Sequence, residues 1–301
     1  MWKNKKNYTN LIINFPLTSC SKKESSETKN ENFSNTLRDV EFITKKYINH
    51  DKNAKANMLS IIDKDMYYQA KIKTNKDKDL KSYIKEKSSG NNKLKWIYDN
   101  FDKLTYGEKV LVGNDDDACD FVYNSHNNKN DFNFYDGQTI NLHRKTPFYL
   151  QWDNRWAYDK LSDDDNIGIA GCGPTSMSMV LSRLLDDEKI NPKLIAKDAK
   201  NHMTNDGVYW SFFEFEADKY KVKIADIDNT EKDIKQALKK GPIIVSVKHG
   251  YFTTGGHIMV IDSVKDDKFL INDPNSIKNS KIEWPYQDIQ DQIVKLWLIY
   301  K

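Results

Sequence analysis

A change of pattern near residue 140 is the feature that most constrains the fold. From 35 to 140, apolar residues recur at the spacing of amphipathic helices within a Lys- and Asn-rich sequence. From 141 to 301, helical spacing alternates with short apolar runs that favour strands. Helices that come first and strands that follow predict an α+β fold. We therefore expect a mainly helical region at 35–140 and a mixed domain at 141–301.

The helical region is expected to hold several amphipathic helices and no chemistry. Its role is either that of an inhibitory propeptide-like segment or that of a helical domain that positions substrate. Their apolar stripes are Leu37–Tyr47, Met58–Tyr67, Leu80–Ile84 and Leu94–Leu104, with a further short helix at Asp115–Tyr123. Residues 124–138 are typical of a loop. His50 and His126 lack metal-ligand spacing, so we interpret them as solvated surface residues. Cys119 is interpreted as a small core residue.

The mixed domain is expected to begin with helices and end with strands. The predicted helices are Pro174–Leu185, Lys193–Met203, Trp210–Tyr220 and Thr230–Lys240, the last with a capping-type start and a terminal glycine. The predicted strands are Pro242–Val247, a hairpin of Ile258–Val264 with Lys268–Asn272, and Ile293–Tyr300.

Composition excludes several classes of function. The 301 residues include 47 Lys and Arg against 44 Asp and Glu, a net charge of +3 that gives little attraction to nucleic acid. There is no apolar run of 18 residues, so no membrane-spanning helix is expected. Three cysteines are too few for a disulfide-stapled scaffold. The 12% aromatic content nevertheless indicates a packed core.

The first 20 residues have the layout of an export signal. Lysines come first, a short apolar stretch follows, and the segment ends in Leu17-Thr-Ser-Cys20. This ending resembles a bacterial lipobox, in which the cysteine is lipidated. The apolar stretch is short and is interrupted by Asn14 and Pro16, so a cytoplasmic leader is the alternative. Residues 21–34 are polar enough to be a disordered tether.

The segment Ile169–Ser176 carries the clearest chemistry. Cys172 lies between Gly171 and Gly173 at the start of a predicted helix. A helix amino terminus offers free N–H groups and partial positive charge, which favour a thiolate. Glycines allow a substrate backbone to approach closely. Cys172 is therefore a candidate nucleophile, and its own N–H a candidate oxyanion donor.

A base and an orienting acid for this thiol are expected from the hairpin. His257 opens its first strand after Gly255-Gly256, and Asp273 ends its second, so pairing would make them neighbours. The amide of Gln151 is a candidate to complete the oxyanion hole. His249 is a rival base, and Asn272 is a rival orienter that should face the opposite side. The order Gln, Cys, His, Asp is that of a papain-like arrangement.

Residues 147–301 resemble the bacteriocin-processing-peptidase-like family of papain-fold cysteine peptidases. The resemblance rests on FYLQWDNRWAY, GCGPTSMSMVLS, the GPIIVSVKHGYFTTGGHIMVIDS block and INDPNSIKNSKIEW. It implies Cys172 as nucleophile, His257 as general base, Asp273 as orienting acid and Gln151 as oxyanion donor. It also implies a helical lobe that holds the Cys and a β lobe that holds the His. Because no exporter segments are present, we do not transfer cleavage after a double-glycine leader.

The expected function is that of an exported, surface-tethered peptidase or amidase with a Cys-His-Asp triad. No cofactor and no metal are expected. The expected partner is a peptide or protein, with contact to a membrane only through lipidated Cys20 and with the oligomeric state left open. Acyl transfer by the same thioester, and a non-enzymatic binding module, are the alternatives. Four tryptophans (Trp152, Trp156, Trp210 and Trp284) would line a cleft or, more often for such residues, fill the core. Trp210 and Gly256 are kept with the flanking glycines as substrate-binding candidates.

Overall fold

The computed structural model describes residues 68–129, 132–204 and 207–301. The predicted stripes at 37–47 and 58–67, the tether, the signal and Cys20 lie outside them. The described part is α+β, as expected. Four helices come first: α4 (Asp77–Lys87), α5 (Asn92–Asp99), α6 (Tyr106–Asn114) and α7 (Cys119–His126), with 3₁₀ turns η1 (Phe101–Lys103) and η2 (Asp116–Ala118) between them.

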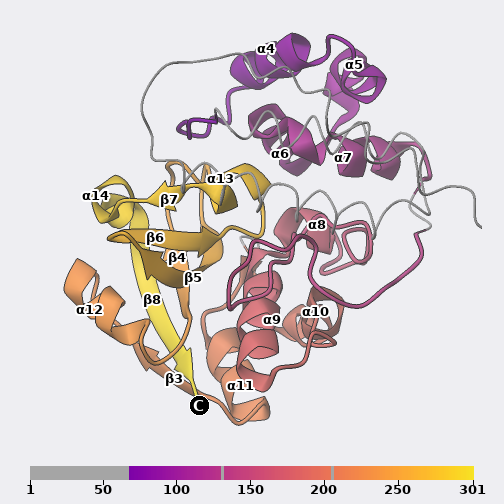
Figure 1. Cartoon of the computed structure of the whole chain (residues 1–301). Coiled ribbons are helices and arrows are strands. Elements are labelled where there is room, and N and C mark those ends of the chain that lie inside the picture. The colour runs from indigo at the N-terminus through magenta and orange to yellow at the C-terminus, as the bar shows by residue number, and fades with distance from the viewer. Residues whose placement is uncertain (1–67, 130–131, 205–206) are drawn as a thin grey trace, which may run out of the picture. The chain divides into compact units, whose positions relative to one another are not determined.

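A second group of helices surrounds the candidate nucleophile. These are α8 (Ile167–Ala170), α9 (Cys172–Leu185), α10 (Pro192–Ala199) with η3 (Lys200–His202), and α11 (Ser211–Lys219). A small hairpin, β1 (Met203–Thr204) and β2 (Gly207–Val208), joins η3 to α11. Figure 1 shows α9 between α10 and the large sheet, so α9 is the central helix of this lobe.

The large sheet is antiparallel, in the order β3-β8-β4-β5-β6-β7. Its strands are β3 (Lys223–Asp226), β4 (Ile243–Val247), β5 (His257–Lys265), β6 (Lys268–Asn272), β7 (Glu283–Trp284) and β8 (Ile293–Tyr300). Three helices accompany these strands: α12 (Glu231–Ala237), α13 (Ile277–Lys281) and α14 (Tyr286–Ile289), the last followed by η4 (Gln290–Gln292). The turn between β5 and β6 has positive φ at both Asp266 and Asp267, as a type I′ hairpin requires.

The central strands are buried on both faces, so their two sets of side chains enter two cores. Ile244, Ile258 and Val260 belong to the cluster that includes α9. Ile243, Val245 and their neighbours on that side pack instead with α12 and Trp284. This explains why Pro242–Val247 is apolar at every position except Ser246. The sheet face toward α9 and the helix α9 itself thus form one rigid support for the site.

The structure differs from the sequence predictions at several element ends. Helix α6 was not expected, because Gly107 and Gly113 dilute its apolar pattern. Its signal was the capping box, in which Thr105 and Glu108 bond each other's backbone N–H. The stretch predicted to be helical through Met203 leaves α-helix at Ala199. The helix predicted through Lys240 ends at Ala237.

Cys119 and His126, in the first helices, have the burial that the sequence predicts. Cys119 is buried on α7, as expected of a core residue, and burial raises the pKa of its thiol. His126 is exposed, as expected of a surface residue. Its Nε2 also lies 2.9 Å from a carboxylate oxygen of Glu108, a partner that the sequence did not predict. Glu108 lies on α6, the helix that the sequence did not predict.

Candidate active site

Cys172 is the first residue of α9, and Gly171 precedes it as the helix cap. Burial would raise the pKa of its thiol, but His257 and the backbone N–H groups of Ile258 and Gly173 bond the sulfur and lower the pKa overall. The sequence placed a helix start here from the glycine and proline pattern, although two residues later. The amino terminus of the helix adds the favourable field of its dipole.

His257 lies between Cys172 and Asp273. Its Nε2 is 2.7 Å from Oδ1 of Asp273, which leaves the other ring nitrogen for the bond to Cys172. Burial would lower the pKa of the imidazole. The charges and hydrogen bonds of Asp273 and Cys172 oppose this and raise its pKa to about 10. The environment therefore favours an imidazolium beside a thiolate.

Asp273 is fully buried and held at both carboxylate oxygens. Oδ1 also accepts the backbone N–H of Asn275 at 2.9 Å, and Oδ2 accepts Nδ2 of Asn279 at 3.0 Å. The backbone N–H of Asp273 donates to Oγ of Ser280 at 2.8 Å. Asn279 and Ser280 were not predicted from the sequence; the polar residues that follow the candidate acid were their signal.

The helix of Cys172 and the strand of His257 are tied together below the site. Oγ of Ser176 donates to the carbonyl of Ile258 at 3.1 Å. Two helical turns further along α9, Arg183 donates to the carbonyl of Asp262 at 3.1 Å and lies 3.3 Å from its carboxylate. These bonds fix α9 against β5, and so fix the sulfur against the imidazole.

The rival base and the rival orienter have other partners. Nε2 of His249 bonds the carbonyl of Lys73 at 3.1 Å, and the side chain is exposed. Asn272 accepts a bond from Arg144 at 2.7 Å and donates to the carbonyl of Thr146 at 3.2 Å. Alternation along β6 therefore turns Asn272 away from the pair that Asp273 forms. Of the remaining histidines, His202 contacts Phe212 and Phe215.

Gln151 contacts the turn that leads into Cys172, and its amide nitrogen already donates two hydrogen bonds there. Nε2 donates to the carbonyls of Gly168 and Ile169, at 3.0 and 3.1 Å. Both amide protons thus bind the turn that leads into Cys172. An oxyanion role would require one of these bonds to open when substrate binds.

The three glycine candidates differ in what surrounds them. A Cβ at Gly171 would lie 2.3 Å from the carbonyl oxygen of Ile167, and one at Gly173 would lie 2.5 Å from a methyl of Val208. A side chain at either of these two positions would therefore collide with the chain's own atoms. Nothing lies within 4 Å of a Cβ built at Gly256, which precedes His257.

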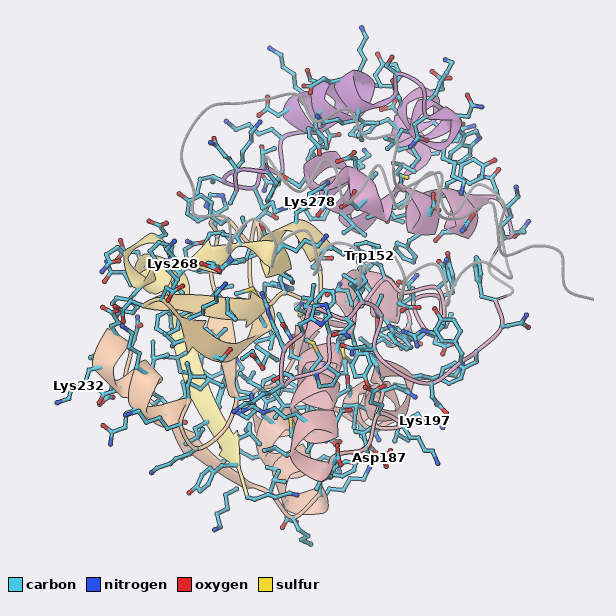
Figure 2. The ribbon with its side chains drawn as sticks, in the orientation of Figure 1. Trp152, Asp187, Lys197, Lys232, Lys268 and Lys278 are labelled. Carbon is cyan, nitrogen blue, oxygen red and sulfur yellow. The ribbon has the colours of Figure 1, made fainter. Side chains whose placement is uncertain are left out.

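Only Trp210 of the four tryptophans is substantially exposed, at 47%. It is the cap residue directly before α11, and its ring contacts Trp297 edge-on with centroids 5.4 Å apart. Trp152, Trp156 and Trp284 are core residues. Nε1 of Trp152, labelled in Figure 2, donates to the carbonyl of Asn275 at 3.1 Å, so this ring braces the Asp273 loop.

One acidic cluster in the described residues has the composition of a cation site. Single carboxylate oxygens of Asp115, Asp116 and Asp117 lie within 4.8 Å of one another. The ammonium of Lys278 lies 2.8 Å from the first two and 3.2 Å from the third, so the chain supplies its own cation. We found no reason to assign a metal to it.

Comparisons with known proteins give a family match and two similar solved structures. Residues 143–301 match the model of the peptidase C39-like family. A solved double glycine motif protease from an AMS/PCAT transporter, in complex with the leader peptide, is 17% identical with a TM-score of 0.35 and covers 55% of this chain and 98% of its own. A C39-like peptidase structure from Bacillus anthracis is 15% identical with a TM-score of 0.35, covering 44% and 89%. No curated protein matches the sequence. Among the described residues, no helix is long and apolar enough to cross a membrane.

Proposed function

The chain belongs to the peptidase C39-like family, and from this premise we propose that Cys172, His257 and Asp273 hydrolyse a peptide or amide bond. One observation carries the proposal. A single buried imidazole bonds both a thiol at a helix amino terminus and a fully buried carboxylate. Nucleophile, base and orienting acid are the three roles that thiol hydrolysis requires.

The proposed reaction has two steps. The thiolate of Cys172 attacks the carbonyl carbon, and the imidazolium of His257 gives its proton to the leaving amine nitrogen as the C–N bond breaks. A thioester on Cys172 remains. Water then attacks the thioester, loses a proton to His257, and releases the acid product and the thiolate. Asp273 holds the ring and stabilises its charge in both steps.

Charge on the carbonyl oxygen needs hydrogen-bond donors during attack. The backbone N–H of Cys172, at the start of α9, is the first candidate. Gln151 is the second, provided that it releases the carbonyl of Gly168 or Ile169. Gly171, Gly173, Gly256 and exposed Trp210 remain proposals for contacts with the substrate.

The experiment compares two cysteine variants of the full chain. Cys172→Ala should abolish cleavage of a peptide library while the circular dichroism spectrum is unchanged. Cys119→Ala removes a buried thiol outside the site and should retain activity. Activity that survives in clean Cys172→Ala protein would falsify the proposal. Adding amine nucleophiles to the wild type distinguishes hydrolysis from acyl transfer by the ratio of amine adduct to free acid, since an acyltransferase gives mainly adduct.

We also propose that the chain is exported and held at the membrane by a lipid on Cys20. The support is the sequence alone: lysines, a short apolar stretch and Leu17-Thr-Ser-Cys20. Fatty-acid labelling of the wild type, lost in Cys20→Ala and retained in Cys119→Ala, is the expected result. Labelling that survives Cys20→Ala would exclude a lipid at this position.

A further inference from the structure

The carboxylate of Asp273 is positioned by a helix too short to hold itself. α13 has five residues, and isolated helices of this length are not stable. Ser276 caps it through the N–H of Asn279, and Asn279 in turn bonds Asp273. The placement of α13 therefore decides the placement of the carboxylate, and α13 must be fixed from outside.

The helices α4–α7 supply that fixation through one buried ion cluster. Nζ of Lys278, on α13, donates to Asp115 and Asp116, each at 2.8 Å. Oγ of Ser276 donates to the second oxygen of Asp115 at 2.8 Å, and Tyr83 donates to Asp116 at 2.7 Å. Lys278 is 6% exposed, so an unpaired ammonium here would be costly. Figure 2 labels Lys278 where α13 meets these helices.

The same helices also pack on the approach to Cys172. A Cβ at Gly107 of α6 would lie 2.6 Å from Ile169, and one at Gly168 would lie 2.4 Å from the ring of Phe121 on α7. The turn through α8 that delivers Cys172 is thus in tight contact with α6 and α7. Both ends of the proposed triad rest on the first helices.

We propose that Lys278 is a positioning residue that fixes Asp273 against His257 by docking α13 onto Asp115 and Asp116. The effect of Lys278 on catalysis rests on the proposed function, whereas its effect on the Cys172–His257 pair can be measured without a substrate. It makes α4–α7 a working part of the site, and not a detachable inhibitor.

The test follows alkylation of Cys172 by iodoacetamide against pH in the full chain, with the modified residue identified by peptide mapping. When Asp273 is displaced, the imidazolium of His257 loses the charge that stabilises it. The thiolate of Cys172 then loses its positively charged partner. Lys278→Met should therefore raise the apparent pKa of Cys172 by about one unit, and Lys278→Arg should restore much of the shift. kcat should fall at least about tenfold with little change in KM.

Two controls separate positioning from general destabilisation. Glu108→Gln weakens α6 and its contact with His126 without touching α13, and should leave the alkylation profile unchanged. In an Asp273→Asn background, Lys278→Met should add no further shift, since both changes act through one carboxylate. If Lys278→Met does not fold, Asp115→Asn, which keeps the shape of a direct partner, is the variant that decides.

Three results would overturn the inference: an unchanged profile in Lys278→Met or its substitute, an equal shift in Glu108→Gln, or additive shifts with Asp273→Asn. Failure of the proposed function is distinguishable from all three. It would appear as peptide cleavage that survives Cys172→Ala, whereas the alkylation profile would still report whether Lys278 positions the pair.

Discussion

At the scale of single residues, the site shifts the pKa values of Cys172 and His257 in opposite directions. The thiol of Cys172 has its pKa lowered, and the imidazole of His257 has its pKa raised to about 10. The ion pair exists at pH values between the two, so kcat/KM should rise as the thiol ionises below its usual value near 8.5 and fall as His257 deprotonates. The carboxylate of Asp273 should set the alkaline limb.

Asp273→Asn tests this assignment because it keeps the hydrogen-bonding shape and removes the charge. Without the charge, the pKa of His257 falls, and the alkaline limb of kcat/KM should move at least about one pH unit lower. A pH profile measured with one peptide substrate checks it. An alkaline limb that stays in place, or that moves upward, would show that another group controls this ionisation.

Gln151→Ala separates an oxyanion donor from a structural clamp. If the amide reaches the developing oxyanion, kcat should fall by about 10²–10³-fold while KM and the alkylation rate of Cys172 are retained. We expect this result. Slower alkylation together with lower kcat would instead show that the bonds to Gly168 and Ile169 matter by placing Cys172.

Glu216, on α11, is a buried carboxyl that the proposed mechanism does not use. Burial, assisted by the charge of Asp198, raises its pKa to about 8. The folded state therefore holds a proton that the unfolded chain releases near its ordinary value of about 4.3. Ionisation of Glu216 should therefore leave stability unaffected below that value and reduce it progressively as pH rises toward 8.

The isosteric variant Glu216→Gln removes this ionisation. Thermal unfolding followed from pH 5 to pH 9 should show a smaller fall in Tm for the variant than for the wild type, with the variant more stable at the alkaline end. Parallel Tm curves for the two proteins would mean that Glu216 ionises at its ordinary pKa.

At the scale of elements, the short turn from α8 to α9 places the sulfur. Gly171→Ala would bring a Cβ to 2.3 Å from a backbone oxygen that cannot move independently. We expect a loss of about 1–3 kcal/mol in stability and slower alkylation of Cys172. Gly256→Ala, in open space beside His257, is the matched control and should change stability by less than about 0.5 kcal/mol. Similar losses in both would contradict this account.

The elements that the sequence predicted well are those whose signals are local. The β5–β6 hairpin followed from two apolar runs across Asp266-Asp267, and its pairing brought His257 to Asp273. The start of α9 followed from the glycines around Cys172. Periodicity could not reveal that Gln151 binds a carbonyl 17 residues away or that Lys278 bonds Asp115, 163 residues away. Such contacts depend on the tertiary fold.

At the scale of the whole described molecule, the boundary expected at 140 does not divide the hydrophobic core. Leu80, Ile97 and Val122 from the first helices belong to the same buried cluster as Met177 of α9 and Val260 of β5. The boundary remains a prediction about domain organisation. The shared cluster and the Lys278 ion cluster both indicate that the first helices stabilise the rest of the chain.

A chain that begins at Phe132 tests this dependence. It removes α4–α7, exposes the apolar surface around Gly168 and Ile169, and leaves Lys278 without Asp115 and Asp116. Because breaking a buried ion pair alone costs about 3–5 kcal/mol, we expect poor solubility or a much lower Tm, and loss of the thiolate at neutral pH. Circular dichroism and the alkylation profile of Cys172 measure the two effects. Loss of a support lowers activity, whereas release from an inhibitor raises it. If the shortened chain unfolds at the wild-type Tm and cleaves peptides faster, the first helices instead inhibit a domain that folds without them.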